Sequence, residues 1–328
     1  MNKVAVIGAG AWGTALAIQA ARAGAGPVAL WARDADRAAA MQQSRENAAH
    51  LPGRSLPEEI EVTADAERAL DGAGLALLVV PAQHMAAVLA GFPSLPPTLV
   101  AAKGVTRDGL RLPLETLALR RPGLRSGILS GPNFAVEVAD GLPAAAVIAS
   151  TDAALREDAA ARLATPGFRL YGQDDPVGAQ VGGAAKNVIA IAAGAVIGAG
   201  LGENARAALV TRGLSEMARL AQALGGRAET VSGLSGLGDL LLTCTGAGSR
   251  NFSLGLALGR GEALAAILAG RNSVTEGVAT APALLARADA AGVDMPIAAA
   301  VSAVLSGQAD MAGAMGNLLS RPRRHEGI

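Results

Sequence analysis

Lys186 stands at the start of an uncharged stretch, 188–202, in which alanine and glycine predominate. On a helix, the small residues Ala190, Gly194 and Gly198 would share one face with it, at steps of four. A lysine beside such an apolar face is costly unless a partner or a cleft receives it. Desolvation also lowers a lysine pKa towards neutrality, which a proton-transfer group requires. The alternative is a lysine that extends from a helix end into water, and this stretch alone favours neither.

Two polar clusters directly follow expected strands. Lys103 comes after the apolar run 98–102, and Gly131 and Asn133 come after the run 126–130. In open α/β sheets, ligands bind at the carboxyl ends of the strands. Both clusters are therefore candidates for ligand contacts.

A third cluster combines a carboxylate with the start of a helix. Asp239 lies in the run Gly-Leu-Gly-Asp-Leu, and Ser249, Arg250 and Asn251 precede a helical stretch. A hydroxyl, a guanidinium and the free amides of a helix start together suit a phosphate group. The alternative is an ordinary helix cap beside a surface arginine, which these three residues also fit.

The first two dozen residues allow three interpretations. Lys3 before a long uncharged run resembles a secretory signal or a membrane anchor. Gly8, Gly10 and Gly13 argue against both, because each costs about 1 kcal/mol in a helix relative to alanine. A strand, a glycine turn and a helix would use every residue of the segment, with the glycines turning the chain, admitting a pyrophosphate and packing helix on strand. We therefore expect a dinucleotide-binding turn here.

Arg33 and Asp34 end the next expected strand. An acidic residue at this place binds the ribose 2′-hydroxyl of NAD, whereas an arginine accommodates the 2′-phosphate of NADP. Because Arg33 comes first, we expect NADP(H) to be accepted, with NAD(H) still open. The alternative is a solvated ion pair at a strand end.

Alternating strand and helix patterns continue to about residue 175 and predict an α/β fold, a Rossmann-like doubly wound and mostly parallel sheet. The expected strands are 3–7, 27–32, 60–62, 75–80, 98–102, 126–130, 144–150 and 168–171. Beyond residue 175 the expected elements are all helices, at 177–200, 203–224, 252–269, 276–291 and 297–307. We therefore predict a dinucleotide-binding domain, 1–175, and a helical substrate and catalytic domain, 176–328.

The composition argues against several classes of protein. Lys+Arg and Asp+Glu both number 28, so no overall field attracts nucleic acid or an anionic membrane. Aromatic residues make up only 2%, too few for the stacking platforms of single-strand binders. Three histidines and one cysteine, Cys244, offer no metal-ligand cluster. A lone cysteine is consistent with a reducing compartment, and we expect a cytoplasmic protein without a metal.

Taken together and in this order, these segments resemble the bacterial-type NAD(P)-dependent glycerol-3-phosphate dehydrogenases. The resemblance spans nearly the whole chain, and the motifs around Lys186 and Asp239 are far more specific than the glycine pattern. Its motifs are GAGAWGTALA near the start, NAAHLPG at 47–53, AAKGV at 101–105, SGPNFAVEVADGLPAA at 130–145, GAQVGGAAKNVIAIAAG at 178–194, TRGLSEMARL at 211–220, GLGDLLLTCTGAGSRN at 236–251 and VTEG at 274–277.

The resemblance implies reversible hydride transfer between dihydroxyacetone phosphate and sn-glycerol 3-phosphate, for glycerophospholipid synthesis. It implies that Lys186 accepts the proton when the alcohol is oxidised and returns it in reduction. The substrate contacts that it implies fall on Lys103, Gly131, Asn133, Lys186, Asp239, Ser249, Arg250 and Asn251. The cofactor contacts fall on Ala11, Trp12, Arg33, Lys103, Ala135, Arg250, Val274 and Glu276, beside the turn glycines Gly8, Gly10 and Gly13.

Three positions depart from the usual family pattern. Asn133 stands where the family usually has Thr or Ser, Trp12 replaces a frequent Tyr or Phe, and Ala11 replaces a frequent Ser. Asp239 could orient Lys186, but an anionic partner raises a lysine pKa while burial lowers it, so the net direction stays open. Two other classes remain as alternatives: a non-catalytic module that senses NADPH, and a related hydroxyacid dehydrogenase that binds carboxylates. The apolar helical domain is compatible with a homodimer.

Overall fold

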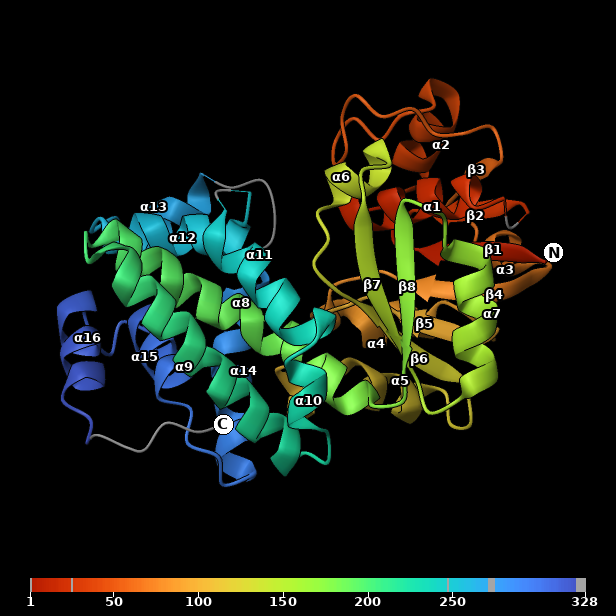
Figure 1. Ribbon diagram of the computed structural model, residues 1–328. Helices are drawn as coiled ribbons and strands as arrows, with labels where there is room; N and C mark the ends of the chain where they lie inside the picture. Colours follow the sequence, from red (N-terminus) through yellow and green to blue (C-terminus); the bar gives the residue numbers. More distant parts are fainter. Residues whose placement is uncertain (1, 25, 247, 271–274, 323–328) are drawn as a thin grey trace. The chain divides into compact units, whose positions relative to one another are not determined.

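The computed structural model describes residues 2–24, 26–246, 248–270 and 275–322, and these fold into two compact units (Figure 1). The first unit comprises Met1–Ala102 and Pro113–Pro176, and the second comprises Lys103–Leu112 and Val177–Ile328. The short segment Lys103–Leu112 thus leaves the sheet-forming part of the chain and belongs to the second unit.

The first unit is built on one eight-stranded sheet in the order β3-β2-β1-β4-β5-β6-β7-β8. Neighbouring strands are parallel throughout, except that β6 and β7 pair antiparallel. This confirms the expected Rossmann-like, mostly parallel sheet. The strands are β1 (Lys3–Ile7), β2 (Val28–Trp31), β3 (Ile60–Thr63), β4 (Ala73–Leu78), β5 (Thr98–Val100), β6 (Ser126–Ser130), β7 (Ala144–Ala149) and β8 (Phe168–Gln173).

Helices pack against this sheet, and its inner strands are mostly apolar. Val4 in β1 lies between Val28 of β2 and Leu75 of β4, and all three side chains are buried. Strands covered on both faces read as continuous hydrophobic runs rather than as alternating ones. The helices are α1 (Ala11–Arg22), α2 (Ala35–Ser44), α3 (Ala66–Leu70), α4 (Met85–Ala90), α5 (Pro113–Arg120), α6 (Ala135–Asp140) and α7 (Ala153–Leu163), with a short 3₁₀ turn at Ala82–His84.

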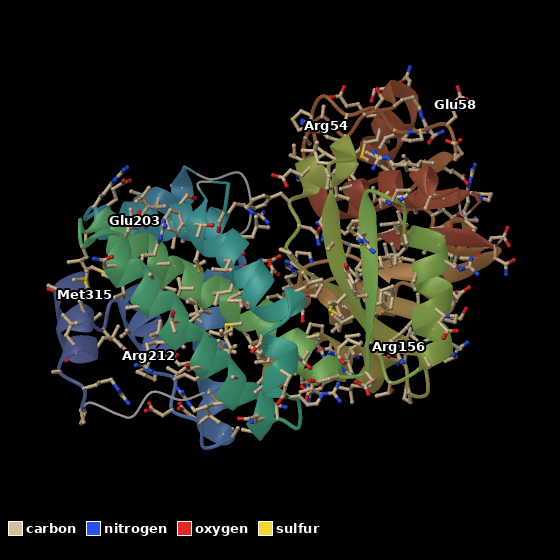
Figure 2. All side chains as sticks on the ribbon, in the orientation of Figure 1. Arg54, Glu58, Arg156, Glu203, Arg212 and Met315 are labelled. Carbon is tan, nitrogen blue, oxygen red and sulfur yellow. The ribbon has the colours of Figure 1, made fainter. Side chains whose placement is uncertain are left out.

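The second unit is helical, and its described residues contain no strand. Besides a 3₁₀ turn at Asp108–Leu110 and a π turn at Leu234–Gly238, its elements are α8 (Pro176–Gly198), α9 (Gly202–Ala223), α10 (Ala228–Val231), α11 (Asp239–Thr245), α12 (Arg250–Gly259), α13 (Leu264–Ala269), α14 (Glu276–Ala290), α15 (Pro296–Leu305) and α16 (Met311–Leu319). Charged side chains such as Glu203 and Arg212 are exposed on α9, as Glu58 is in the first unit (Figure 2).

The long helices begin and end close to the predicted positions, whereas the shorter ones do not. The single helix expected over 252–269 is two helices, because Gly261 takes φ +88° and breaks the helical backbone between α12 and α13. Helices α10, α11 and α16 were not expected. The strands predicted to reach residues 80 and 102 end at Leu78 and Val100.

Helix α8 is the centre of the second unit. It is long and apolar enough to span a membrane, but 89% of its most apolar window is buried in the protein, as in the core helix of a globular unit. Its small residues let α12 approach closely. A Cβ added to Gly194 would overlap the carbonyl oxygen of Phe252, and one added to Gly255 would overlap that of Ile191. The two backbones therefore touch directly.

We predict that Gly194→Ala destabilises the protein, whereas Gly316→Ala does not. Both glycines are helical, but a Cβ on Gly316 would meet no atom within 4 Å. Alanine at 316 should be neutral or stabilising by up to about 1 kcal/mol, while overpacking at 194 should cost about 1–3 kcal/mol. Denaturant unfolding of the two variants and the parent measures the difference. Equal stabilities for the two variants would contradict the close contact of α8 with α12.

Glu216 on α9 is a buried carboxylate that caps another helix. Its oxygens accept hydrogen bonds from the amides of Ile297, at 2.8 Å, and Ala298, at 3.3 Å, in the first turn of α15. Only 2% of the residue is exposed. Burial raises the pKa of Glu216 to about 7, against the opposing influence of the two backbone hydrogen bonds.

This raised pKa predicts a pH-dependent stability that Glu216→Gln should remove. Between its ordinary pKa of 4.5 and about 7, Glu216 holds a proton in the folded protein that the unfolded chain releases. The free energy of unfolding should therefore fall as pH rises through this window, by about 3 kcal/mol in total. We expect Glu216→Gln to gain that much relative to the parent between pH 4.5 and pH 7.

Urea unfolding across this pH range measures the effect. Glu203→Gln, at an exposed position on the same helix, is the control and should parallel the parent. If the Glu216→Gln curve also parallels the parent, Glu216 does not titrate in this window.

Candidate functional site

The glycine turn after β1 is fixed by two close approaches of the backbone. Gly8 takes φ +119°, and a Cβ there would lie 2.6 Å from the carbonyl oxygen of Val79, just after β4. A Cβ on Gly13 in α1 would overlap the carbonyl oxygen of Gly8. Gly8 and Gly13 are therefore required by the turn and by the packing of α1 on β1, respectively.

Gly10 has no such packing reason. It is extended, it is the N-cap of α1 without a side-chain hydrogen bond, and a Cβ there would meet no protein atom within 4 Å. This turn lies where the strand order reverses, between β1 and β4, which is where doubly wound sheets bind dinucleotides. A helix start with open space at a glycine fits a pyrophosphate, with Ala11 and Trp12 as the first helical residues.

The acidic residue at the end of β2 is engaged in local structure. Asp34 is the N-cap of α2, and its carboxylate accepts a hydrogen bond from the Arg37 amide at 2.8 Å. Arg33 beside it is exposed. The Asp34 carboxylate therefore stabilises the start of α2, whereas the exposed Arg33 guanidinium is the group here that suits a ligand.

Gly131, Asn133 and Ala135 follow β6 in the first unit. Gly131 takes φ +155°, and Ala135 begins α6. The Asn133 amide donates to the carbonyl oxygen of Ala145 on β7 at 3.0 Å, while its Oδ1 is buried without a protein partner. A buried acceptor of this kind is costly unless something else donates to it, so Oδ1 suits a ligand hydroxyl.

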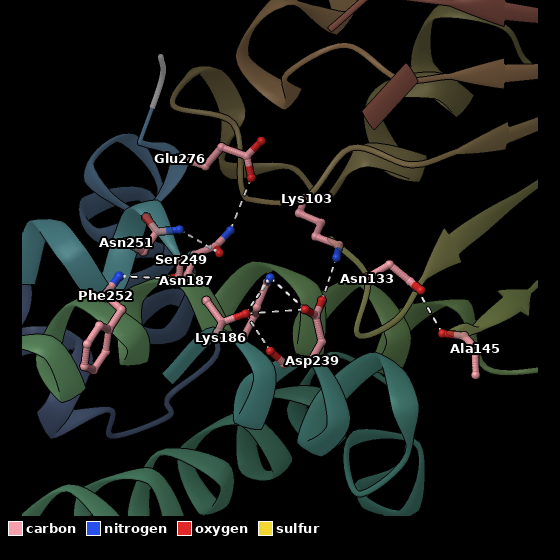
Figure 3. A network of polar contacts seen from close by, with 11 residues as sticks. Lys103, Asn133, Ala145, Lys186, Asn187, Asp239, Ser249, Asn251, Phe252 and Glu276 are labelled. Carbon is pink, nitrogen blue, oxygen red and sulfur yellow. Dashed lines mark hydrogen bonds and ion pairs between the residues drawn. The ribbon is translucent and has the colours of Figure 1, made fainter. Parts of the chain in front are cut away.

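In the second unit, Asp239 lies between two lysines (Figure 3). Its Oδ1 is 2.8 Å from Nζ of Lys186 and its Oδ2 is 2.6 Å from Nζ of Lys103. Lys186 also donates to Oγ1 of Thr243, at 2.9 Å. Asp239 and Thr243 are buried, and Lys186 is only 8% exposed. Lys186 lies in the middle of α8, so the alternative of a lysine that reaches water from a helix end is wrong.

The balance of charge in this cluster lowers the pKa of Lys186. Burial is the largest cause; Asp239 opposes it, while the nearby Lys103 ammonium adds to it. For Asp239, burial acts to raise the pKa, but the two ammonium groups outweigh burial and the pKa is lowered. The sequence left the direction for Lys186 open, and the structure gives it: this lysine is more acidic than an exposed one.

An amide network lies beside the lysine cluster (Figure 3). Asn251 donates to Oδ1 of Asn187 at 2.9 Å and accepts from the amide of Gly277 at 3.0 Å. Asn187 in turn donates to a carboxylate oxygen of Glu276, at 3.3 Å. The network connects the residue after Lys186 to the starts of α12 and α14, which carry Asn251 and Glu276.

The start of α12 has the geometry of an ordinary cap. Ser249 is its N-cap, and Oγ accepts from the amide of Phe252 at 3.2 Å. Arg250, the first helical residue, is exposed. The capping alternative thus holds for Ser249, while the guanidinium and the helix-start amides still suit an anion.

The expected residues fall into two groups, one in each unit. Gly8, Gly10, Ala11, Trp12, Gly13, Arg33, Gly131, Asn133 and Ala135 belong to the first unit, and Lys103, Lys186, Asp239, Ser249, Arg250, Asn251 and Glu276 belong to the second. Val274 lies outside the described residues. Among the described residues, no group of three or more His, Cys, Asp or Glu could hold a metal ion.

Thr243 belongs to the lysine cluster and Asn187 to the amide network, but neither was expected from the sequence. Thr243 lies four residues after Asp239 on α11, so the helical period would have placed both on one face. Its hydroxyl donates to the carbonyl oxygen of Asp239 at 2.6 Å and accepts from Lys186. Asn187 adjoins Lys186 in the chain, but nothing in the sequence shows that it meets Asn251.

A glycine turn at the reversal of a doubly wound sheet, in a chain that also buries a lysine on a carboxylate, defines a dinucleotide-dependent oxidoreductase. Two family models cover almost the whole chain: the NAD-dependent glycerol-3-phosphate dehydrogenase N-terminus matches residues 3–156, and the corresponding C-terminus matches residues 175–316. The chain belongs to the NAD-dependent glycerol-3-phosphate dehydrogenase family, which reversibly reduces dihydroxyacetone phosphate to sn-glycerol 3-phosphate with NAD(P)H.

Individual relatives agree over their full lengths. The chain is 55% identical over 323 residues to glycerol-3-phosphate dehydrogenase [NAD(P)+] of Acidiphilium cryptum, covering 98% of each chain. It is 50% identical to that of Rhodospirillum rubrum, covering 100% of this chain and 95% of the relative. The crystal structure of glycerol-3-phosphate dehydrogenase from Coxiella burnetii superposes with a TM-score of 0.91 at 37% identity, covering 98% of this chain and 99% of that one.

The cluster predicts opposite pKa changes when either neighbour of Lys186 loses its charge. Lys103→Met removes a repelling ammonium and should raise the pKa of Lys186, whereas Asp239→Asn removes the attracting carboxylate and should lower it further. The chain has only three lysines, at 3, 103 and 186, so NMR titration of protein with ¹³C-labelled lysine side chains resolves each one.

Asp294→Asn, at an exposed ion pair with Arg321, is the control and should leave Lys186 unchanged. Asp239→Asn also leaves the buried Lys186 ammonium without a counterion, which costs about 3–5 kcal/mol of stability. Lys103→Met should cost less stability than Asp239→Asn. The direction of the Lys186 pKa shift in Lys103→Met alone therefore tests the charge balance. Shifts of the same sign in both variants would contradict the charge balance described here.

Proposed function

We propose that this chain carries out the family reaction with Lys186 as the general acid and base. The observation that carries the proposal is the Lys186 ammonium, buried on α8 and held by Asp239 and Thr243, with a lowered pKa. A proton-transfer group works best when its pKa lies near the working pH, and burial moves a lysine in that direction.

Bound NAD(P)H would supply the hydride to the carbonyl carbon. Lys186 would donate its proton to the carbonyl oxygen as negative charge develops there, and in the reverse direction it would accept the proton of the hydroxyl. Asp239 and Thr243 occupy two of the three donor directions of the ammonium. These two hydrogen bonds fix the direction of the third N–H of Lys186. A substrate oxygen would have to lie in that direction to accept the proton.

The charges of the cluster suit an anionic substrate. With Lys186 protonated, two ammonium groups face one carboxylate, an excess of one positive charge. We propose Lys103, Lys186, Asp239, Gly131 and Asn133 as contacts of the three-carbon backbone, and Ser249, Arg250 and Asn251 as the contacts of the phosphate. For the phosphate, the Arg250 guanidinium and the amides of α12 supply the charge, since the Ser249 hydroxyl already caps the helix.

For the cofactor we propose the turn after β1 as the pyrophosphate site. Gly10 supports this, since a Cβ there would fill the space beside the helix start. Arg33 would face a 2′-phosphate, which favours NADP(H) over NAD(H). The remaining proposed contacts are Gly8, Ala11, Trp12, Gly13, Lys103, Ala135, Arg250, Val274 and Glu276.

We further propose that residues 1–175 form the dinucleotide-binding domain and that residues 176–328 form the substrate and catalytic domain, to which Lys103, Gly131 and Asn133 add substrate contacts from the first 175 residues. The role in the cell that follows is the supply of sn-glycerol 3-phosphate for glycerophospholipid synthesis in the cytoplasm. The balanced charge argues against a nucleic-acid partner or a membrane surface, and we propose a homodimer.

The test is turnover by Lys186→Ala. Purified protein with NADPH and dihydroxyacetone phosphate should consume NADPH, and Lys186→Ala should lower kcat by at least about a hundredfold, since general acid–base catalysis contributes 10²–10⁴. The Kd of Lys186→Ala for NADPH should change little, because the proposed pyrophosphate site is in the first unit and Lys186 is in the second.

Lys3→Ala, which removes the lysine that donates to the Arg68 carbonyl, is the control and should keep full activity. A Lys186→Ala variant that retains most of its turnover would remove Lys186 from the mechanism. A parent protein that binds NADPH but reduces no dihydroxyacetone phosphate would support the sensing module instead.

A further inference from the structure

The segment between α2 and β3 carries the motif Asn-Ala-Ala-His-Leu-Pro-Gly, at 47–53, to which the proposed chemistry gives no role. Its first residue, Asn47, is completely buried. Nδ2 of Asn47 donates to the carbonyl oxygen of Ala9, at 3.1 Å, and to Oγ1 of Thr14, at 2.7 Å. Because a carbonyl oxygen only accepts, the amide nitrogen has to face Ala9. A side chain of this segment therefore holds the middle of the glycine turn.

The segment itself is firmly built. The main-chain carbonyl of Asn47 accepts from the amides of His50 and Leu51, and the Leu51 side chain is fully buried in the core of the first unit. Glu46 pairs with Ser55 in an antiparallel bridge, and its carboxylate accepts from the Gly53 amide at 2.7 Å. Asn47 is thus presented from a fixed position.

The same carbonyl oxygen accepts a second side-chain donor. Nη2 of Arg37, in the first turn of α2, donates to Ala9 as well. Arg37 lies in the first turn of α2 and Asn47 lies after its last residue, yet both side chains donate to the same carbonyl oxygen of the turn. A backbone carbonyl with two side-chain donors is strongly fixed in direction.

We propose that Asn47, supported by Arg37, is a positioning residue for the pyrophosphate of the dinucleotide. The Ala9–Gly10 peptide is planar and trans, so a carbonyl held on the side of Asn47 and Arg37 directs the N–H of Gly10 to the opposite side. Thr14, the other partner of Asn47, lies in the first turn of α1, so the turn and the helix start are held together. This inference rests on the proposed pyrophosphate site, and it adds the residue that sets the direction of its amides before a ligand arrives.

Binding measurements with pyrophosphate ligands test the role. By calorimetry, Asn47→Ala should weaken ADP-ribose, NADH and NADPH by the same factor, about tenfold, which is the loss expected for an amide direction no longer fixed. Because all three ligands share the pyrophosphate, the ratio of NADPH to NADH affinity should stay as in the parent. Asn47→Asp keeps the shape but turns an acceptor towards the Ala9 carbonyl, so it should weaken all three further.

Gln19→Ala is the matched control. Gln19 is an equally buried amide on α1, the helix that Asn47 contacts through Thr14, and its nitrogen donates to the carbonyl of Leu163 at 2.9 Å, away from the turn. It should lower the melting temperature as Asn47→Ala does and leave the three affinities unchanged. Arg37→Met, at a half-buried position, tests the second donor if Asn47 variants do not fold, and should weaken ADP-ribose in the same direction.

The inference would be overturned by an ADP-ribose affinity that is unchanged in both Asn47→Ala and Arg37→Met, or by a loss as large in Gln19→Ala. A change confined to NADPH would also overturn it, because it would place these residues at the 2′-phosphate. These readouts need no turnover, so they are separate from the test of Lys186. If the parent itself binds no ADP-ribose, the proposed pyrophosphate site fails, and the role of Asn47 within it fails with it.

Discussion

The arrangement of the second unit depends on one carboxylate shared by two ammonium groups in a buried place. Asp239 cannot be ionised there without a counterion, and neither can Lys186, because an isolated buried charge is very costly. Two ammonium groups share this one carboxylate, and burial, with a smaller contribution from the nearby Lys103 ammonium, lowers the pKa of Lys186 although Asp239 opposes the shift. Structural stability and acid–base chemistry therefore have the same physical origin in this cluster.

Small residues make this burial possible. Lys186 lies on a helix whose other side chains are mostly alanine, glycine and valine, and α12 packs against it with the backbones in contact at Gly194 and Gly255. Larger side chains would separate these helices and admit water. Water around Lys186 would restore the ordinary pKa of an ammonium group, because desolvation is the largest cause of the shift. The unusual glycine content, 42 residues, thus serves the site as well as the turns.

Lysine and arginine have different roles in this chain. Only three of the 28 lysines and arginines are lysines, and two of these three contact Asp239. Arginine cannot be deprotonated in a protein, whereas lysine shifts its pKa readily on burial. Arginine elsewhere binds carboxylates and carbonyls, as Arg54 does with Asp140 and Arg37 with Ala9. The residue type whose charge can change is thus concentrated in the cluster for which we propose proton transfer.

The sequence alone determined the class of fold and the identity of most polar residues at the site. Apolar runs alternating with helical patterns and glycine turns predict a doubly wound sheet because these patterns lie within short stretches of the chain. The long helices were predictable for the same reason, but α11 was not, because it is short and its apolar period covers fewer than two turns. Only the tertiary structure decided which partners meet. It placed Asp239 between Lys103 and Lys186, which are 136 and 53 residues away in the chain. It also brought Asn47 into contact with Ala9 of the glycine turn, 38 residues earlier. It also gave the direction of the Lys186 pKa, since burial and two opposite neighbouring charges act at distances that no spacing along the chain encodes.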